Sequence, residues 1–234
     1  MTTALAPRPY RLDVHPPGAA GDGLADDVRR GLAAPPRRLP PKHFYDERGS
    51  GLFERITRLP EYYQSRTELA VLRRIAPELV ARHGVGEVVE LGSGASRKTA
   101  VLLDAVRAAG RTGRYVPFDV CPPAVLAAAG RLAGAYPGLD VHGVCGDFGH
   151  DLGRLPAPAG GGRRMVAFLG GTIGNLEPEE RTPFLRAVAG LLRPGDLLVV
   201  GTDLAGDPER IRAAYDDAAG VTAEFNRNVL RVIN

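Results

Sequence analysis

Lysine is scarce in this chain: of its 30 basic residues, only Lys42 and Lys98 are lysines. The other basic residues are arginines spread along the sequence, and they form no polybasic run. The formal net charge is only +3, although the pI is about 9.1. A small charge without a basic cluster gives no electrostatic footprint for DNA or RNA, so we expect no nucleic-acid partner.

Cysteines and long apolar runs are also few. Cys121 and Cys145 are too few for a disulfide framework, and the five histidines form no cluster with metal-ligand spacing. The first residues contain no apolar core of a signal peptide, and no apolar run approaches the length of a membrane span. We therefore expect a cytoplasmic protein with no metal and no membrane partner.

The first third of the chain precedes any strand pattern. Residues 1 to 38 are rich in Ala, Pro and Gly and predict a loose arm with one short helix at about 24 to 32. Residues 39 to 84 predict a helical segment, with one helix near 51 to 59. Ser65 and Glu68 form a capping box for a second helix, which Pro77 is expected to bend or split.

From residue 86 onward, strand and helix patterns alternate. This alternation predicts an α/β fold with a parallel sheet and helices on both faces. The expected strands are 87 to 91, 114 to 119, 139 to 145, 164 to 170 and 196 to 203, and the expected helices are 96 to 109, 122 to 135, 178 to 193 and 208 to 219. Ligands of such sheets bind beyond the carboxyl ends of the strands.

The stretch from Glu87 to Thr99, EVVELGSGASRKT, carries the main signal. A buried strand runs through Glu90 into a turn in which Gly92 and Gly94 permit positive φ and close approach of a ligand. Ser96 is the expected N-cap of the following helix.

Three chemistries use such a turn. A dinucleotide fingerprint would need a third glycine at position 97, where this chain has Arg97. A P-loop NTPase would use Lys98 and Thr99, but Arg97 again replaces a required glycine. A carboxylate at Glu90 would repel a pyrophosphate, whereas it suits a cationic, phosphate-free ligand such as S-adenosylmethionine.

The next strand ends favour the third chemistry. The second strand ends at Asp119, whose carboxylate can accept hydrogen bonds from two ribose hydroxyls. The third is followed by Asp147 and Phe148, an acid and an aromatic ring that suit an adenine amino group and ring face. After the fourth strand, a glycine-rich loop that ends at Asn175 indicates a small substrate held by backbone groups and that amide.

Seven motifs together resemble the histidine Nα-methyltransferases of ergothioneine biosynthesis. The resemblance extends from about residue 39 to residue 234 and rests on KHFYDERGSGLFERITRLPEYYQSRTE, ELGSGASRKT, PFDV, VCGDF, FLGGTIGN, GTDL and YDDAAGVTAEFNRN. It implies a Rossmann-like class I methyltransferase fold and transfer of three methyl groups from S-adenosylmethionine to the α-amine of L-histidine, giving hercynine. Residues 85 to 220 would then be the cofactor-binding core.

The resemblance also implies roles for individual residues. The cofactor would be bound by Gly92, Lys98, Asp119, Asp147 and Phe148. Histidine would be held by Tyr62, Asn175 and Tyr215, and Tyr45 would lie near the amine as the catalytic residue. Without the resemblance, Lys98 is an ordinary surface lysine and the three tyrosines are packing residues.

Two departures from the family pattern bear on the substrate. Gly171 stands where the family usually has Ser, which removes one hydroxyl from the substrate loop. Family members also continue beyond Asn234 into a strand-rich segment with an acidic residue that recognises the imidazole. We therefore expect a sheet that is incomplete at the C-terminus. Residues 221 to 234 would be the truncated start of that segment. The alternative functions are a cofactor-binding but inactive fragment and a methyltransferase for another small amine.

Overall fold

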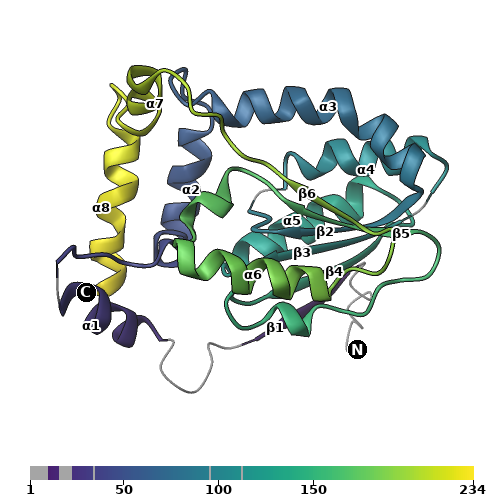
Figure 1. Ribbon diagram of the computed structural model, residues 1–234, viewed down its shortest axis with the longest axis horizontal. Helices are drawn as coiled ribbons and strands as arrows, with labels where there is room; N and C mark the ends of the chain where they lie inside the picture. Colours follow the sequence, from purple (N-terminus) through teal and green to yellow (C-terminus); the bar gives the residue numbers. More distant parts are fainter. Residues whose placement is uncertain (1–9, 16–22, 34, 95, 112) are drawn as a thin grey trace, which may run out of the picture.

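A six-stranded parallel sheet forms the centre of the molecule (Figure 1). The computed structural model describes residues 10–15, 23–33, 35–94, 96–111 and 113–234. The strand order is β1-β4-β3-β2-β5-β6, and every neighbouring pair is parallel. The strands are β1 Arg11–Val14, β2 Val85–Leu91, β3 Arg114–Asp119, β4 Asp140–Cys145, β5 Arg163–Phe168 and β6 Leu197–Val200.

Eight α-helices and three short 3-10 helices are found in the described residues. The α-helices are α1 Leu24–Ala33, α2 Glu47–Ile56, α3 Gln64–His83, α4 Thr99–Ala108, α5 Pro122–Ala135, α6 Pro178–Gly190, α7 Pro208–Tyr215 and α8 Val221–Ile233. The 3-10 helices are η1 Pro41–Phe44, η2 Leu152–Arg154 and η3 Thr172–Asn175. The predicted alternation of strands and helices from residue 86 onward is therefore confirmed.

Alternate residues of each strand point to opposite faces of the sheet. Both faces are apolar, and helices cover both of them. Val88 belongs to the core beneath α3, α4 and α5. Its neighbour Val89 belongs to the core beneath α6 and the η2 segment. Two separate apolar cores therefore hold the sheet in place, as in a doubly wound α/β fold.

The strand β1 was not predicted, because residues 1 to 38 were expected to be a loose arm with one helix. Arg11 to Val14 pair in parallel with His142 to Cys145 at the edge of the sheet. Close approach is possible because Gly143 has no side chain: a Cβ there would lie 3.0 Å from Leu12 and 2.7 Å from Val125. The rest of the expected arm, at 1 to 9 and 16 to 22, lies outside the described residues.

A third apolar core joins the early helices to the end of the chain. Leu52 and Ile56 of α2 pack with Ala214 of α7 and Val221 of α8. In Figure 1, α8 lies beside α2, with α1 near its last turn. Residues 221 to 234 thus form a helix against the N-terminal helices, and after β6 the described chain adds no strand.

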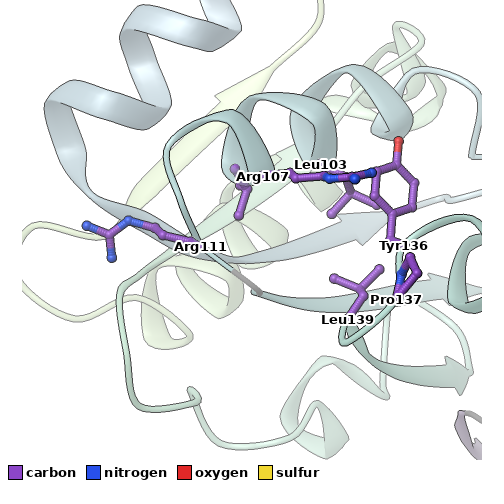
Figure 2. A pocket seen from close by; sticks show the side chains of 7 residues that line it. Leu103, Arg107, Arg111, Tyr136, Pro137 and Leu139 are labelled. Carbon is purple, nitrogen blue, oxygen red and sulfur yellow. The ribbon is translucent and has the colours of Figure 1, made fainter.

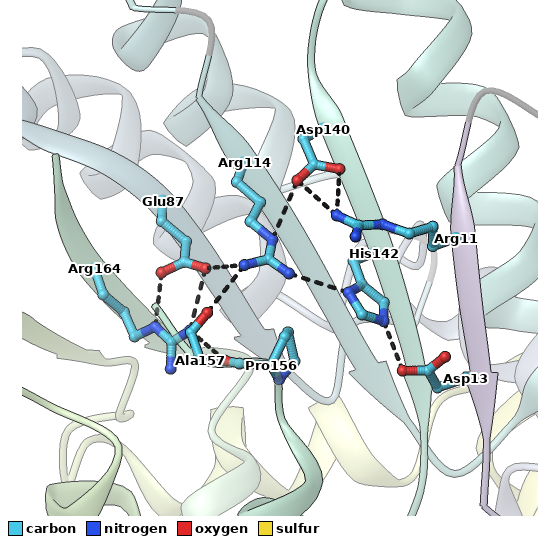
Figure 3. A network of polar contacts seen from close by, with 9 residues as sticks. All are labelled: Arg11, Asp13, Glu87, Arg114, Asp140, His142, Pro156, Ala157 and Arg164. Atoms are coloured by element: carbon cyan, nitrogen blue, oxygen red, sulfur yellow. Dashed lines mark hydrogen bonds and ion pairs between the residues drawn. The ribbon is translucent and has the colours of Figure 1, made fainter. Parts of the chain in front are cut away.

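Buried charges tie together the amino ends of the strands, as Figure 3 shows. Glu87 accepts hydrogen bonds from Arg164 at 2.8 and 3.1 Å, and Arg114 lies 3.4 Å away. Arg114 also donates to Nδ1 of His142, which leaves Nε2–H of that ring to donate to Asp13 at 2.7 Å. These contacts join β2, β5, β3, β4 and β1, which leaves the carboxyl ends for a ligand.

Two predicted helix starts are wrong. The helix α3 begins at Gln64, and its N-cap residue is Tyr63, which makes no side-chain cap hydrogen bond. The carboxylate of Glu68 binds the amide of Gly170 instead, and Pro77 lies inside the helix without splitting it. The helix α4 begins at Thr99, and Ser96 has a φ of 49° and bonds to Tyr115. Within the described residues, no helix has both the length and the apolar character needed to cross a bilayer.

Candidate functional site

The glycine turn after β2 is fastened to the end of β3. The amides of Gly92 and Ser93 both donate to the carbonyl of Phe118, at 2.8 and 3.1 Å. Gly92 has a φ of 71° and Gly94 a φ of 44°, so both occupy the left-handed region that favours glycine. The Oγ of Ser93 is buried and has no hydrogen-bond partner among the described residues. A buried hydroxyl without a partner needs an explanation, and a polar ligand atom at this turn would supply one.

The carboxylate of Glu90 is bound by hydroxyls of the protein, and its expected role beside a cationic ligand stays a prediction. Its carboxylate is only 4% exposed and accepts hydrogen bonds from the hydroxyls of Thr99 and Tyr115. Burial raises the pKa of Glu90 from its ordinary value of 4.5 to about 7, against the lowering effect of those two hydrogen bonds. The same bond occupies the Thr99 hydroxyl, which argues against the P-loop alternative.

Asp119 lies at the carboxyl end of β3, directly below the turn. Its Oδ2 accepts from the amide of Gly94 at 2.9 Å, and its Oδ1 accepts from the amide of Cys121 at 3.0 Å. Burial raises the pKa of Asp119, and these backbone hydrogen bonds offset only part of the rise. Each oxygen keeps a second lone pair, so the carboxylate is oriented and can still accept from a diol.

Asp147 and Phe148 follow the end of β4 and complete the same surface. The amide of Gly146 donates to the carbonyl of Asp119 at 3.1 Å, which places the two strand ends side by side. The ring of Phe148 stacks on Phe118 with centroids 5.6 Å apart and lies against Gly92, where a Cβ would be 3.4 Å from it. The structure therefore brings the turn and both acids into one region.

Lys98 reaches the loop after β5. Its ammonium pairs with the carboxylate of Glu68, which also accepts from the amide of Gly170 at 2.9 and 3.0 Å. Lys98 is about one-fifth exposed, so its charge is close to solvent but fixed in direction. This pair connects α3, the start of α4 and the end of β5 around the glycine turn.

The three tyrosines lie in one aromatic cluster. The ring of Tyr62 meets that of Tyr215 edge-on at 6.0 Å and that of Phe53 at 6.1 Å. Tyr45 contacts Phe53 at 5.5 Å and Phe225 of α8 at 5.4 Å. Residues distant in the chain thus form one wall beside the carboxyl ends of the strands.

All three tyrosine hydroxyls remain protonated at neutral pH. Burial and the nearby negative charge of Asp119 raise the pKa of Tyr45 to about 12. Burial also raises the pKa of Tyr62 and of Tyr215, and the negative charge of Asp203 raises both in the same direction. The wall therefore presents neutral hydroxyls that can give and accept hydrogen bonds.

Asn175 is not joined to this wall. It ends the short helix η3 and is exposed. No hydrogen bond or ring contact in the described part of the chain connects it to Tyr62 or Tyr215. Its predicted role in substrate binding stays a prediction.

Three residues of the site were missed by the motifs: Lys42, Glu68 and Ser93. Glu68 was interpreted as a capping residue, although its carboxylate binds Lys98 and Gly170. Lys42 donates to Asp147 at 2.8 Å. The scarcity of lysine could have indicated the pairs Lys42–Asp147 and Lys98–Glu68, because the only two lysines of the chain occupy this region.

Two cavities among the described residues lie elsewhere. One cavity, of about 200 Å³, lies beside Tyr136. In Figure 2 the side chain of Arg111 points away from the tyrosine ring, and it donates to the carbonyl of Gly161. It lies near the last turn of α4, at the amino ends of the strands. A second hollow of about 550 Å³ runs between α3 and α4 over Leu69 and Val101. Neither cavity is lined by Asp119 or Asp147, the acids at the strand ends.

The sheet order, the glycine turn after its first core strand and the acids at the next two strand ends define a Rossmann-like class I methyltransferase fold. Residues 24–234 match the family described as "Histidine-specific methyltransferase, SAM-dependent". The chain belongs to this family.

Curated relatives agree with this assignment, and a solved structure agrees with the fold. The chain is 55% identical to a histidine N-alpha-methyltransferase of Mycolicibacterium smegmatis over 92% of its own length and 66% of that protein. It is 52% identical to one of Mycobacterium tuberculosis over 90% of its own length and 65% of that protein. The chain thus spans slightly less than two thirds of these curated relatives. A DUF574 family protein of Streptomyces avermitilis shares the fold, with a TM-score of 0.50 and 14% identity over 80% of this chain and 70% of that one.

Proposed function

We propose that this chain transfers methyl groups from S-adenosylmethionine to the α-amine of L-histidine, giving hercynine in the first step of ergothioneine biosynthesis. The observation that carries this proposal is the polar surface at the carboxyl ends of β2, β3 and β4. There a buried Ser93 hydroxyl has no described partner, and the carboxylates of Asp119 and Asp147 lie nearby. The family assignment and the mycobacterial relatives support the choice of substrate.

The residues present fit S-adenosylmethionine, which would supply an electrophilic methyl group on a sulfonium when bound. Asp119 would accept from the ribose hydroxyls, and Asp147 with Phe148 would meet the adenine. Gly92 provides the close backbone approach, and Lys98 supplies a cation for the carboxylate of the amino-acid part. The neutral, unpartnered hydroxyl of Ser93 suits a polar atom of the same ligand.

The acceptor amine would be held on the other side, by the aromatic wall. Residues 39 to 84 and 221 to 234 build this side. Tyr45 packs directly against Phe225, and Tyr62 is connected to Phe225 through Phe53. Asn175 and Tyr215 would complete the histidine site. We place the protein in the cytoplasm and assign it no nucleic-acid and no membrane partner.

The chemistry required of these residues is mainly positioning. Transfer needs a free amine lone pair in line with the methyl carbon, at roughly 3–3.5 Å. The pKa of about 12 keeps the Tyr45 hydroxyl neutral, so it can orient the amine through hydrogen bonds but is a weak base. Water would therefore take the amine proton before each transfer.

Two measurements test the proposal. Calorimetry with S-adenosylhomocysteine should show binding, and no binding would refute the cofactor assignment. Incubation with S-adenosylmethionine and L-histidine should give products heavier by one, two and three methyl groups in mass spectrometry. L-Leucine, which keeps the α-amine and lacks the imidazole, is the control substrate. Cofactor binding without histidine methylation would favour another small amine or a binding function alone.

A further inference from the structure

Lys42 and Lys98, the only lysines of the chain, both pair with carboxylates in the candidate site. Every other basic residue apart from histidine is arginine. Lysine differs from arginine in presenting a compact, strongly hydrated point charge that several acceptors can share. Lys98 already has an expected role toward the cofactor, whereas Lys42 has none.

The ammonium of Lys42 bridges two carboxylates from different parts of the chain. Its Nζ lies 2.8 Å from Oδ2 of Asp147 and 3.1 Å from Oδ2 of Asp27. The side chain is 24% exposed, so solvent only partly screens these contacts. Burial by itself raises the pKa of Asp147, but the hydrogen bonds from Lys42 and from the amide of Gly149, together with the positive charge of Lys42, leave the pKa lowered. The carboxylate of Asp147 is therefore held ionised.

Asp27 anchors the lysine from behind. This residue of α1 is only 5% exposed, and it also accepts hydrogen bonds from Arg30 at 2.5 Å and from His43 at 2.8 Å. A nearly buried carboxylate is costly to leave without its cations. The position of the Lys42 ammonium is therefore set by α1 and not only by Asp147.

Both oxygens of Asp147 are then fixed. Lys42 holds Oδ2, and the amide of Gly149 donates to Oδ1 at 2.9 Å. The remaining lone pairs point in a defined direction, which is what a hydrogen-bonding site for a nucleobase amino group requires.

We propose that Lys42 is a positioning residue for nucleoside binding, which orients Asp147 and connects it through η1 to Tyr45. The connection is short, because Lys42 and Tyr45 are separated by His43 and Phe44, and the amide of Tyr45 donates to the carbonyl of Lys42. The adenine side and the amine side of the site thus share one anchored segment. This inference rests on the proposed function, since it assumes that Asp147 meets a nucleoside.

A purely structural role would make Lys42 a packing contact between η1 and the core. The two roles differ in a double-mutant cycle. If Lys42 acts through Asp147, its replacement matters only while the Asp147 carboxylate is present. If it merely packs, the effects of the two replacements on ligand affinity are independent.

The experiment measures S-adenosylhomocysteine affinity by calorimetry, with thermal unfolding to verify the fold of each variant. We expect Lys42→Met to weaken binding about tenfold, because a charge-assisted hydrogen bond that orients the acceptor is lost. In an Asp147→Asn background, the same replacement should change the affinity less than about twofold. Lys42→Arg, which keeps the charge, should restore most of the affinity.

Arg29→Met is the matched control, because it removes an exposed ion pair with Asp26 on the same helix α1. It should leave the affinity unchanged. If Lys42→Met does not fold, Lys42→Gln makes the same comparison, since it keeps an N–H donor without the charge. Equal affinities for wild type and the neutral variant, or additive losses in the cycle, would overturn the role of Lys42 alone. Absence of binding by the wild type would overturn the proposed function and this inference together.

Discussion

Replacing Glu90 by glutamine should stabilise the protein at alkaline pH. Both described hydrogen bonds to this side chain, from Thr99 and Tyr115, end on Oε2. A glutamine can place its carbonyl oxygen at that position and accept both, while its NH₂ takes the place of Oε1. The replacement therefore removes the buried negative charge and keeps the shape and the polar partners.

The size of the effect follows from the pKa of Glu90, which burial raises from its ordinary value of 4.5 to about 7. Since the folded state holds its proton more tightly, it binds more protons than the unfolded state between these two values. Stability is therefore lost as the pH rises through this window. Each pH unit is worth about 1.4 kcal/mol, which gives a total of about 3 kcal/mol above pH 7.

The assay is urea unfolding of the wild type and Glu90→Gln, without ligand, at several values from pH 5 to pH 9. The difference in unfolding free energy should be small near pH 5 and grow to about 3 kcal/mol in favour of the variant above pH 7. Glu78→Gln on the exposed side of α3 is the control for replacing a surface carboxylate by an amide. A pH-independent difference for Glu90→Gln would refute the argument, because the carboxylate would then be ionised throughout.

Three further outcomes are expected. Asp119→Ala should weaken S-adenosylhomocysteine binding by roughly 1–3 kcal/mol in calorimetry, and an unchanged affinity would remove Asp119 from the site. Tyr45→Phe should lower the methylation rate by less than the roughly 10²–10⁴-fold loss expected when a general base is removed. The pH profile of the rate should stay the same, because the pKa of about 12 keeps the Tyr45 hydroxyl neutral. An altered profile would show that this hydroxyl takes the proton of the amine. Arg164→Met should lower the free energy of unfolding in urea by about 3 kcal/mol, because Glu87 loses two buried hydrogen bonds. A loss below about 1 kcal/mol would show that Arg114 compensates for the lost partner of Glu87.

The sequence by itself determined the architecture from residue 86 onward. Apolar runs with β-branched residues and turn glycines predict β2 to β6, and β2 to β5 are strands buried on both faces, for which such runs leave few alternatives. The parallel order also predicts that Asp119 and Asp147 meet the glycine turn, since all carboxyl ends lie at one edge. The family resemblance added Tyr45, Tyr62 and Tyr215, which no local pattern distinguishes from packing aromatics.

Only the tertiary structure decided what the short and polar segments do. β1 is four residues long and mostly exposed, and it becomes a strand because β4 offers an edge beside Gly143. Glu68 matches a capping pattern, yet its carboxylate gains more by binding Lys98 and the amide of Gly170. Lys42 meets Asp147 across 105 positions of sequence. Local preferences amount to a few tenths of a kcal/mol up to about 1 kcal/mol, whereas a partly buried ion pair gains more, so distant partners decide where such side chains point.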